Sequence, residues 1–73
     1  RDVFLVIEPE GPGGTLGVLV DGMRAADTAD VRGGVLAPSE SRLYHLVRLE
    51  AAGPHVLRLV VKGRLRLYAF TFG

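Results

Sequence analysis

The side chains that could do chemistry are few, and their spacing does not assemble a reactive site. The chain has no cysteine, and its two histidines, His45 and His55, lie ten residues apart. Neither histidine has a carboxylate or a thiol at the spacing of a metal site or a catalytic triad. Ser39 and Ser41 lie outside the Gly-x-Ser-x-Gly motif that presents a nucleophilic serine. We therefore expect no catalytic activity, no metal and no cofactor, and we interpret both histidines as structural.

Two further groups could bind ions. Asp21, Asp27 and Asp30 offer oxygen ligands for calcium, but their spacing differs from that of an EF-hand loop, and loop aspartates usually accept hydrogen bonds from their own backbone. Residues 11–14 are glycine-rich, yet the run lacks the Lys-Ser/Thr pair of a phosphate-binding loop, and no predicted helix follows it. We interpret the aspartates as loop-forming residues and the glycine-rich run as a turn.

Two tyrosines share a predicted strand face with arginines and are the candidates for recognising a ligand. Tyr44 lies with Arg42, and Tyr68 lies with Arg66. An aromatic ring flanked by hydrogen-bond donors is a common device for binding a sugar, so these four residues form the candidate glycan site. The chain has no tryptophan, and both tyrosines could equally be buried with satisfied hydroxyls. We favour a structural or protein-contact role over a sugar site.

The charge balance argues against a polyanionic partner. Nine basic and eight acidic residues give a net charge of +1, too small a field to indicate nucleic acid or an anionic membrane. No apolar run approaches the roughly 18 residues of a membrane span, and no signal peptide is visible. Six of the basic residues lie in the second half of the chain, where a solvated strand face explains them: Arg42, Arg48, Arg58, Lys62, Arg64 and Arg66.

The elements that must position these residues are strands. Alternating apolar and polar residues predict an all-β fold, an antiparallel β-sandwich or jelly-roll-like domain of about six short strands. Gly63 should permit a tight hairpin, so residues 42–73 are predicted to form a three-stranded meander. Asp21-Gly22 is a turn signature, and residues 23–34 should form a loop with at most one helical turn. The predicted strands lie near residues 2–8, 15–20, 34–37, 42–50, 55–62 and 64–72, separated in one place by a loop at 9–14.

Two of these strands carry specific expectations about burial. Residues 64–72 become apolar on both faces toward their end, which predicts a central strand with Phe70 and Phe72 in the core. In the strand at 42–50, the inner face is expected to hold Leu43, His45, Val47 and Leu49.

Seventy-three residues make a single domain, residues 1–73, which buries only about 60% of the surface of its unfolded chain. Without disulfides, its stability must come from packing. The chain begins within a strand-like run, so we expect a fragment of a longer protein with uncovered apolar edges. Such edges predict self-association, and a homodimer is the expected state of the isolated chain.

Several segments together resemble, in order and spacing, the carboxy-terminal module of DipZ-type and related thioredoxin-like proteins. They are residues 2–6, 20–22, 29–31, 42–48 and 68–73, the last reading Tyr-Ala-Phe-Thr-Phe-Gly. In that family the module is similar to a carbohydrate-binding β-sandwich and follows a thioredoxin-fold domain. The family module extends further upstream, so this chain resembles its second half.

The resemblance implies an accessory domain of a thiol-disulfide oxidoreductase. The redox Cys-x-x-Cys motif belongs to the thioredoxin domain and is absent here, so redox activity does not carry over to this chain. The implied partners are the protein's own thioredoxin domain or a protein client, with a glycan as the alternative. The compartment would be extracytoplasmic in a DipZ-like protein and cytoplasmic otherwise.

Overall fold

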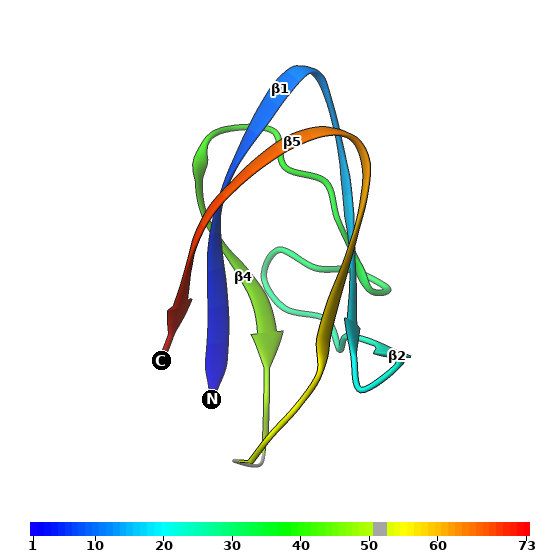
Figure 1. The fold of residues 1–73 in the computed structure, drawn as a ribbon, viewed down its shortest axis with the longest axis vertical. Helices are drawn as coiled ribbons and strands as arrows, with labels where there is room; N and C mark the ends of the chain where they lie inside the picture. Colours follow the sequence, from blue (N-terminus) through cyan, green and yellow to red (C-terminus); the bar gives the residue numbers. More distant parts are fainter. Residues whose placement is uncertain (51–52) are drawn as a thin grey trace.

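A computed structural model describes residues 1–50 and 53–73, and its regular elements there are five β-strands without a helix (Figure 1). All strand pairings are antiparallel, and the sheet does not close. The predicted antiparallel all-β class is therefore confirmed. In the described part of the chain no helix is long or apolar enough to cross a bilayer. The strands are β1 (Asp2–Val20), β2 (Met23–Arg24), β3 (Val35–Leu36), β4 (Arg42–Arg48) and β5 (Leu57–Phe72).

The organising element is β1, which pairs with all four other strands. Its first half lies between β4 and the end of β5, with Leu5 opposite both Tyr44 and Phe70. Its second half lies between β5 and the short strands, with Leu16 opposite both Leu36 and Val61. The prediction that residues 64–72 form the central strand is wrong, because β5 has β1 as its one strand partner among the described residues.

Both β1 and β5 bend where breaks were predicted, and neither strand ends there. The two strands cross at Gly14 and Gly63, beside a bulge in which residues 10–13 of β1 lie opposite Arg64. A Cβ atom at Gly14 would overlap the backbone of residues 62–64, and one at Gly63 would lie 2.6 Å from the carbonyl oxygen of Gly13. Glycine permits this close crossing because it has no side chain. Gly63 adopts a φ of +83°, as a turn would need, but it kinks one long strand.

This bend overturns the predicted meander. β4 does not pair with β5; both pair with β1, on opposite sides. The bend also arches the β1–β5 ribbon over the top of the molecule (Figure 1). Side chains from both halves of the bent ribbon, such as Leu5 and Val18, join one buried cluster. The two halves of the sheet thus enclose a single core.

The Asp21-Gly22 turn is confirmed. Asp21 and Gly22 have φ values of 52° and 82°, and Val20 lies opposite Met23 across a two-residue hairpin loop. Positive φ at both loop positions is the requirement of a type I′ turn. The following segment contains no helical turn, but it places Ala25 and Val31 in the core.

A bulge in β4 reverses part of its predicted orientation. Val3 lies opposite Val47 whereas Phe4 lies opposite His45, so Leu46 is an extra residue in β4. An extra residue shifts the period-two alternation by one, so Tyr44 and Val47 both face the core. The predicted inner face is therefore wrong at Leu43, which is 46% exposed.

β5 contributes little to the core. Leu57, Leu59 and Leu65 are half-buried, and every other residue of the strand is exposed. Phe70 is 46% exposed and Phe72 is 74% exposed, so their predicted burial is wrong. The reason is topological, because no described element packs over β5. The buried hydrophobic residues of the core are Val3, Leu5, Ile7, Leu16, Val18, Ala25, Val31, Leu36, Tyr44, Leu46 and Val47.

Candidate binding surface on strand β5

One long edge of β5 has no strand partner in the described part of the chain. Asp21 N donates to Val56 O at 2.8 Å, which marks these residues as a hydrogen-bonded pair. Such pairs alternate along an antiparallel ladder, so Leu57, Leu59 and Val61 direct their backbone N–H and C=O groups away from β1. An exposed row of unpaired backbone groups can template another strand.

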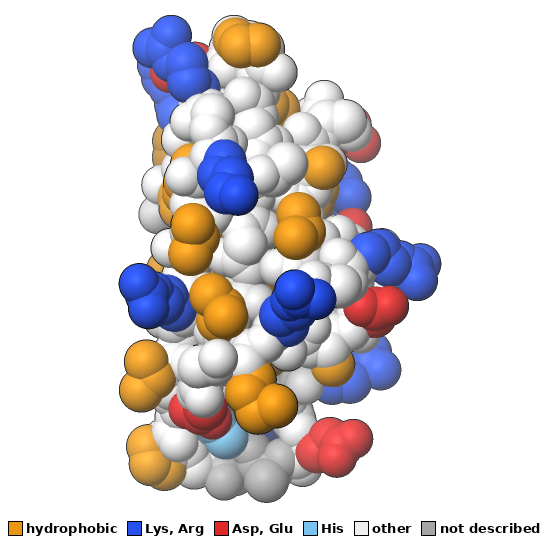
Figure 2. Space-filling model, turned by 90° about the vertical axis from the view of Figure 1, so that its right-hand side faces the viewer, with side chains coloured by type: hydrophobic (Ala, Val, Ile, Leu, Met, Phe, Trp, Pro, Cys, Tyr) orange, Lys and Arg blue, Asp and Glu red, His pale blue; other side chains and the backbone are white. Residues whose placement is uncertain are grey.

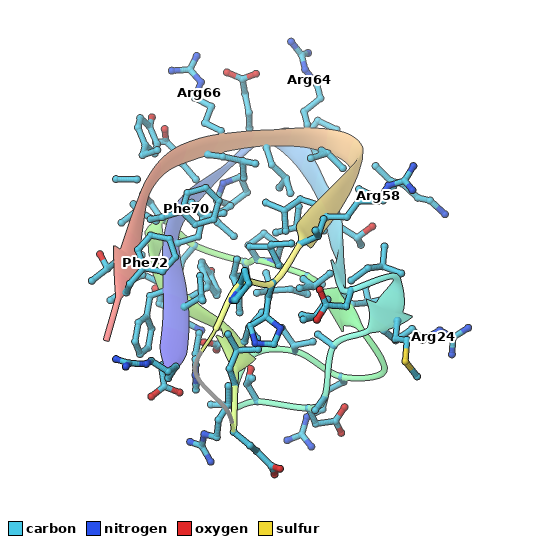
Figure 3. All side chains as sticks on the ribbon, turned by 60° about the horizontal axis from the view of Figure 1, so that its bottom comes forward. Arg24, Arg58, Arg64, Arg66, Phe70 and Phe72 are labelled. Carbon is cyan, nitrogen blue, oxygen red and sulfur yellow. The ribbon has the colours of Figure 1, made fainter. Side chains whose placement is uncertain are left out.

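The outer face of β5 is cationic. It carries Arg58, Lys62, Arg64 and Arg66, and Figure 2 shows basic side chains interspersed with separate apolar ones on the face that includes the start of β5. Figure 3 shows Arg58, Arg64 and Arg66 extending outward from the strand. Because the sequence of β5 contains no acidic residue, any neutralising charge must come from another element.

Glu10 of β1 neutralises one half of this outer face. Glu10 accepts a hydrogen bond from Arg66 Nε at 2.6 Å and lies 3.6 Å from Arg64 Nη2. The hydrogen bond to Glu10 raises the pKa of Arg66 above its usual value. Arg58 and Lys62 form no ion pair with any described residue. The first half of β5 therefore carries two uncompensated cations.

The inner face of β5 is apolar and partly uncovered. Leu67 lies opposite Ile7, but Phe70 lies opposite Leu5, so β5 has one extra residue between them. This bulge turns the end of the strand over and puts Phe70 and Phe72 on the side of the core (Figure 3). Their rings stack with centroids 6.2 Å apart. Nothing among the described residues buries them.

A pocket of about 310 Å³ lies beside these aromatic rings. It is lined by Val3 and Val20 from the two halves of β1 and by Arg1 and Gly73 at the two ends of the chain, and these ends lie close together (Figure 1). We call the outer cations, the inner apolar side chains and the free edge together the β5 surface; its side chains are Arg58, Lys62, Arg64, Arg66, Val61, Leu67, Phe70 and Phe72. The apolar side chains that line the pocket are Val3, Val20, Val47, Leu49, Leu57 and Phe72.

The structure separates the four predicted glycan-site residues into two unlike pairs. Tyr44 is 3% exposed, and its hydroxyl donates to Glu40 O at 2.6 Å. Arg42 covers the Tyr44 ring at 3.9 Å from its centroid, and its Nη2 donates to Asp30 Oδ1 at 2.8 Å. For Tyr44, the alternative of a buried ring with a satisfied hydroxyl is confirmed, and no ring face is offered to a sugar.

Arg66 belongs to the β5 surface, and Tyr68 lies two residues further along the same strand. Tyr68 is 57% exposed, and its hydroxyl donates to Glu8 Oε1 at 2.5 Å. The two pairs lie on strands that flank opposite sides of β1, so the structure does not bring them together.

Both histidines bind an aspartate that is distant in sequence. His45 Nε2 lies 2.8 Å from Asp2 Oδ1, and His55 Nδ1 lies 2.7 Å from Asp21 Oδ2. These hydrogen bonds lower the pKa of each aspartate. The His45 ring also stacks on Phe4, with centroids 4.7 Å apart. Each histidine joins two segments of the fold, which supports a structural role.

The loop aspartates Asp27 and Asp30 also accept hydrogen bonds from backbone N–H groups. Asp27 accepts from Gly33 N at 2.9 Å, and Asp30 accepts from His45 N at 2.8 Å as well as from Arg42. The described residues contain no group of three or more side chains that could ligate a metal.

Sequence analysis missed the exposure of Phe70 and Phe72. Their aromatic character predicts burial, and the bulge at Tyr68-Ala69 that reorients them has no glycine or proline to mark it. The absence of acidic residues in β5 was the available signal, because it distinguishes this strand from an ordinary solvated one.

Comparison with known proteins identifies a family. A model of the thioredoxin-like C-terminal domain family matches residues 1–73. No curated protein and no solved structure matches the chain. Since the family match spans the whole chain, this protein belongs to the thioredoxin-like C-terminal domain family.

Proposed function

We propose that this domain is a non-catalytic accessory module that uses the β5 surface to contact a protein, either the thioredoxin-fold domain of the same protein or a protein client. Membership of the family supports an accessory role in a thioredoxin-like protein. The exposed aromatic pair Phe70 and Phe72, on an edge strand that has no second partner among residues 1–50 and 53–73, is the observation that carries the proposal. Aromatic side chains grouped on a surface are typical anchors of protein interfaces.

The chemistry of the remaining residues fits a module without its own reaction. The described histidines and loop aspartates are engaged in hydrogen bonds that connect strands and loops. By its resemblance to DipZ-type proteins, the module would serve a thiol-disulfide oxidoreductase whose reactive thiols lie in the neighbouring domain. The isolated chain should therefore leave the rate of thiol-disulfide exchange unchanged. A rate increase caused by this chain alone would contradict the proposal.

The contact is tested by titrating the labelled chain with the parent's thioredoxin-fold domain and, separately, with a client protein. Phe70→Ser should weaken binding at least about tenfold, as expected for an aromatic anchor. Leu43→Ser is the matched control, because Leu43 and Phe70 are both 46% exposed and Leu43 lies on β4. Equal affinities of the two variants would refute a role for the β5 surface, and no binding to either protein would refute the proposed function.

Glycan binding is the second candidate. It is favoured by Tyr68, an exposed ring beside two arginines that are held by Glu10. Titration with cell-wall oligosaccharides should then show an affinity that Tyr68→Ala abolishes, although this variant leaves Tyr44 and Arg42 unchanged. Binding that survives Tyr68→Ala would exclude this surface as the sugar site.

A further inference from the structure

We infer that the first half of β5, residues 57–62, accepts an extended partner segment as an added β-strand, and that this segment alternates apolar and acidic residues. The inference rests on the proposed function and specifies the chemistry of the partner. Its three components are the free backbone edge, the apolar inner face and the two uncompensated cations on the outer face.

The backbone edge determines the form of the ligand. Leu57, Leu59 and Val61 turn their N–H and C=O groups toward the free edge, as the alternation from the Asp21–Val56 hydrogen bond requires. A strand that pairs there satisfies these groups in the way that strand-addition complexes do. The kink at Gly63 limits a straight partner strand to this half of β5.

The inner face determines one set of partner side chains. Val61 is 43% exposed, and Leu57 and Leu59 are half-buried. These three residues pair directly with Leu16, Val18 and Val20 of β1, so they lie on the same face of the sheet. An added strand would align its inward side chains with this row. Leu57 also lines the pocket that Phe72 borders, so inward apolar side chains of the partner would extend the core into that pocket.

The outer face of β5 determines the outward side chains of the partner segment. Arg58 and Lys62 point outward, have no described ion-pair partner, and flank Val60 on the same face. Side chains directly across from them on an added strand lie close enough to pair, and opposite charges stabilise such cross-strand pairs. Acidic residues at alternate positions of the partner therefore match this edge.

The same charges weigh against a second copy of this chain as the occupant. β5 contains four basic and no acidic residues. Antiparallel pairing of β5 with its own copy would place cations across from cations, which destabilises the pair. A protein segment with the opposite charge is the better match, and self-association becomes one outcome of the test.

The test uses the whole chain and a labelled heptapeptide, Val-Glu-Val-Asp-Val-Glu-Val, with blocked ends. A peptide with Lys in place of each acid and a peptide of the same composition without alternation are the controls. We expect the alternating acidic peptide to bind at least about tenfold more tightly than either control, and its affinity to fall with added salt. Equal binding of the charge-swapped peptide would refute the charge complementarity.

Variants of the chain separate the three components. Arg58→Glu with Lys62→Glu should reduce peptide affinity about tenfold or more, whereas Arg32→Glu should change it less than about twofold. Arg32 is the matched control because it carries the same charge, has a side chain that is 78% exposed, and lies near β3 on the other side of β1. Equal effects of these substitutions would refute a specific role for the β5 cations.

Proline tests the backbone contact. Val61→Pro and Val61→Ala both remove the branched side chain of valine, but only proline removes the outward N–H, and edge strands tolerate proline at such positions. Val61→Pro should therefore bind the peptide more weakly than Val61→Ala, with circular dichroism confirming that both variants keep the β fold. Equal affinities would exclude strand addition.

Failure of this inference can be distinguished from failure of the proposed function. If Phe70→Ser abolishes binding of the protein partner while the Arg58 and Lys62 variants bind it normally, the module contacts a partner but not through an added acidic strand. If sedimentation shows that the unmodified chain dimerises and the Val61→Pro variant is monomeric, a second copy occupies this edge and the inference is overturned.

Discussion

The crossing of β1 and β5 at Gly14 and Gly63 gives the sharpest test of how this small fold holds together. Gly63 and Gly22 have nearly the same backbone conformation, with φ values of +83° and +82°. Their surroundings differ. A Cβ atom at Gly22 would meet nothing within 4 Å, whereas at Gly63 it would lie 2.6 Å from Gly13 O and 2.8 Å from Gly14 Cα. Alanine at the two positions therefore separates backbone strain from steric overlap.

The expected magnitudes follow from that difference. Gly22→Ala should cost about 1–2 kcal/mol, the cost of placing an L-residue at positive φ. Gly63→Ala should cost this amount plus about 1–3 kcal/mol, because the overlapping atoms are backbone atoms that can yield only if the two strands separate. A 73-residue domain has a stability of roughly 4–11 kcal/mol, so Gly63→Ala removes a large part of it.

The assay is urea denaturation of both variants, followed by far-ultraviolet circular dichroism. Thermal scans should show Gly63→Ala melting roughly 5–20 °C below Gly22→Ala, from the usual relation between stability and Tm for domains of this size. If the two variants lose equal stability, the close crossing is not what requires glycine at position 63, and our account of the bend is refuted.

Three further predictions follow from the core and its polar contacts. Leu5→Ala, at a residue 1% exposed, should lower the free energy of unfolding by about 2–5 kcal/mol. Phe72→Ser, at a residue 74% exposed, should change it by less than about 0.5 kcal/mol. Similar losses for both variants in urea denaturation would show that the end of β5 belongs to the core. Tyr44→Phe should cost about 0.5–1.5 kcal/mol in the same measurement, because the fold loses the hydroxyl that donates to Glu40 O; a neutral effect would show that water replaces this bond. The hydrogen bond from Arg42 lowers the pKa of Asp30, so the carboxylate stabilises the fold above its unfolded pKa of about 4, and this contribution is lost as the pH falls through the lower folded pKa. Asp30→Asn should therefore destabilise the fold at pH 7 and flatten the acid side of its pH–stability curve. An unchanged acid slope would refute the linkage between Asp30 ionisation and stability.

The amino-acid sequence by itself determined the local features of this protein. Period-two alternation predicted the all-β class, and Asp21-Gly22 predicted a two-residue turn that the structure contains. Gly63 was correctly identified as a position that permits positive φ, although the hairpin predicted there is wrong. The structural interpretation of His45 and His55 followed from the spacing of potential ligands. These features depend on a residue and its near neighbours, so a sequence can specify them without knowledge of the fold.

Only the tertiary structure decided which strands pair and which faces are buried. Every residue type except proline offers the same backbone hydrogen-bonding groups, so the sequence does not state that β4 and β5 both pair with β1. Single-residue bulges at Leu46 and at Tyr68-Ala69 reverse the faces that follow them, and a shift by one residue exchanges inside for outside. The candidate site depends on these long-range choices. Tyr44 is buried and Phe72 is exposed because β1, and not the aromatic end of the chain, occupies the centre of the sheet.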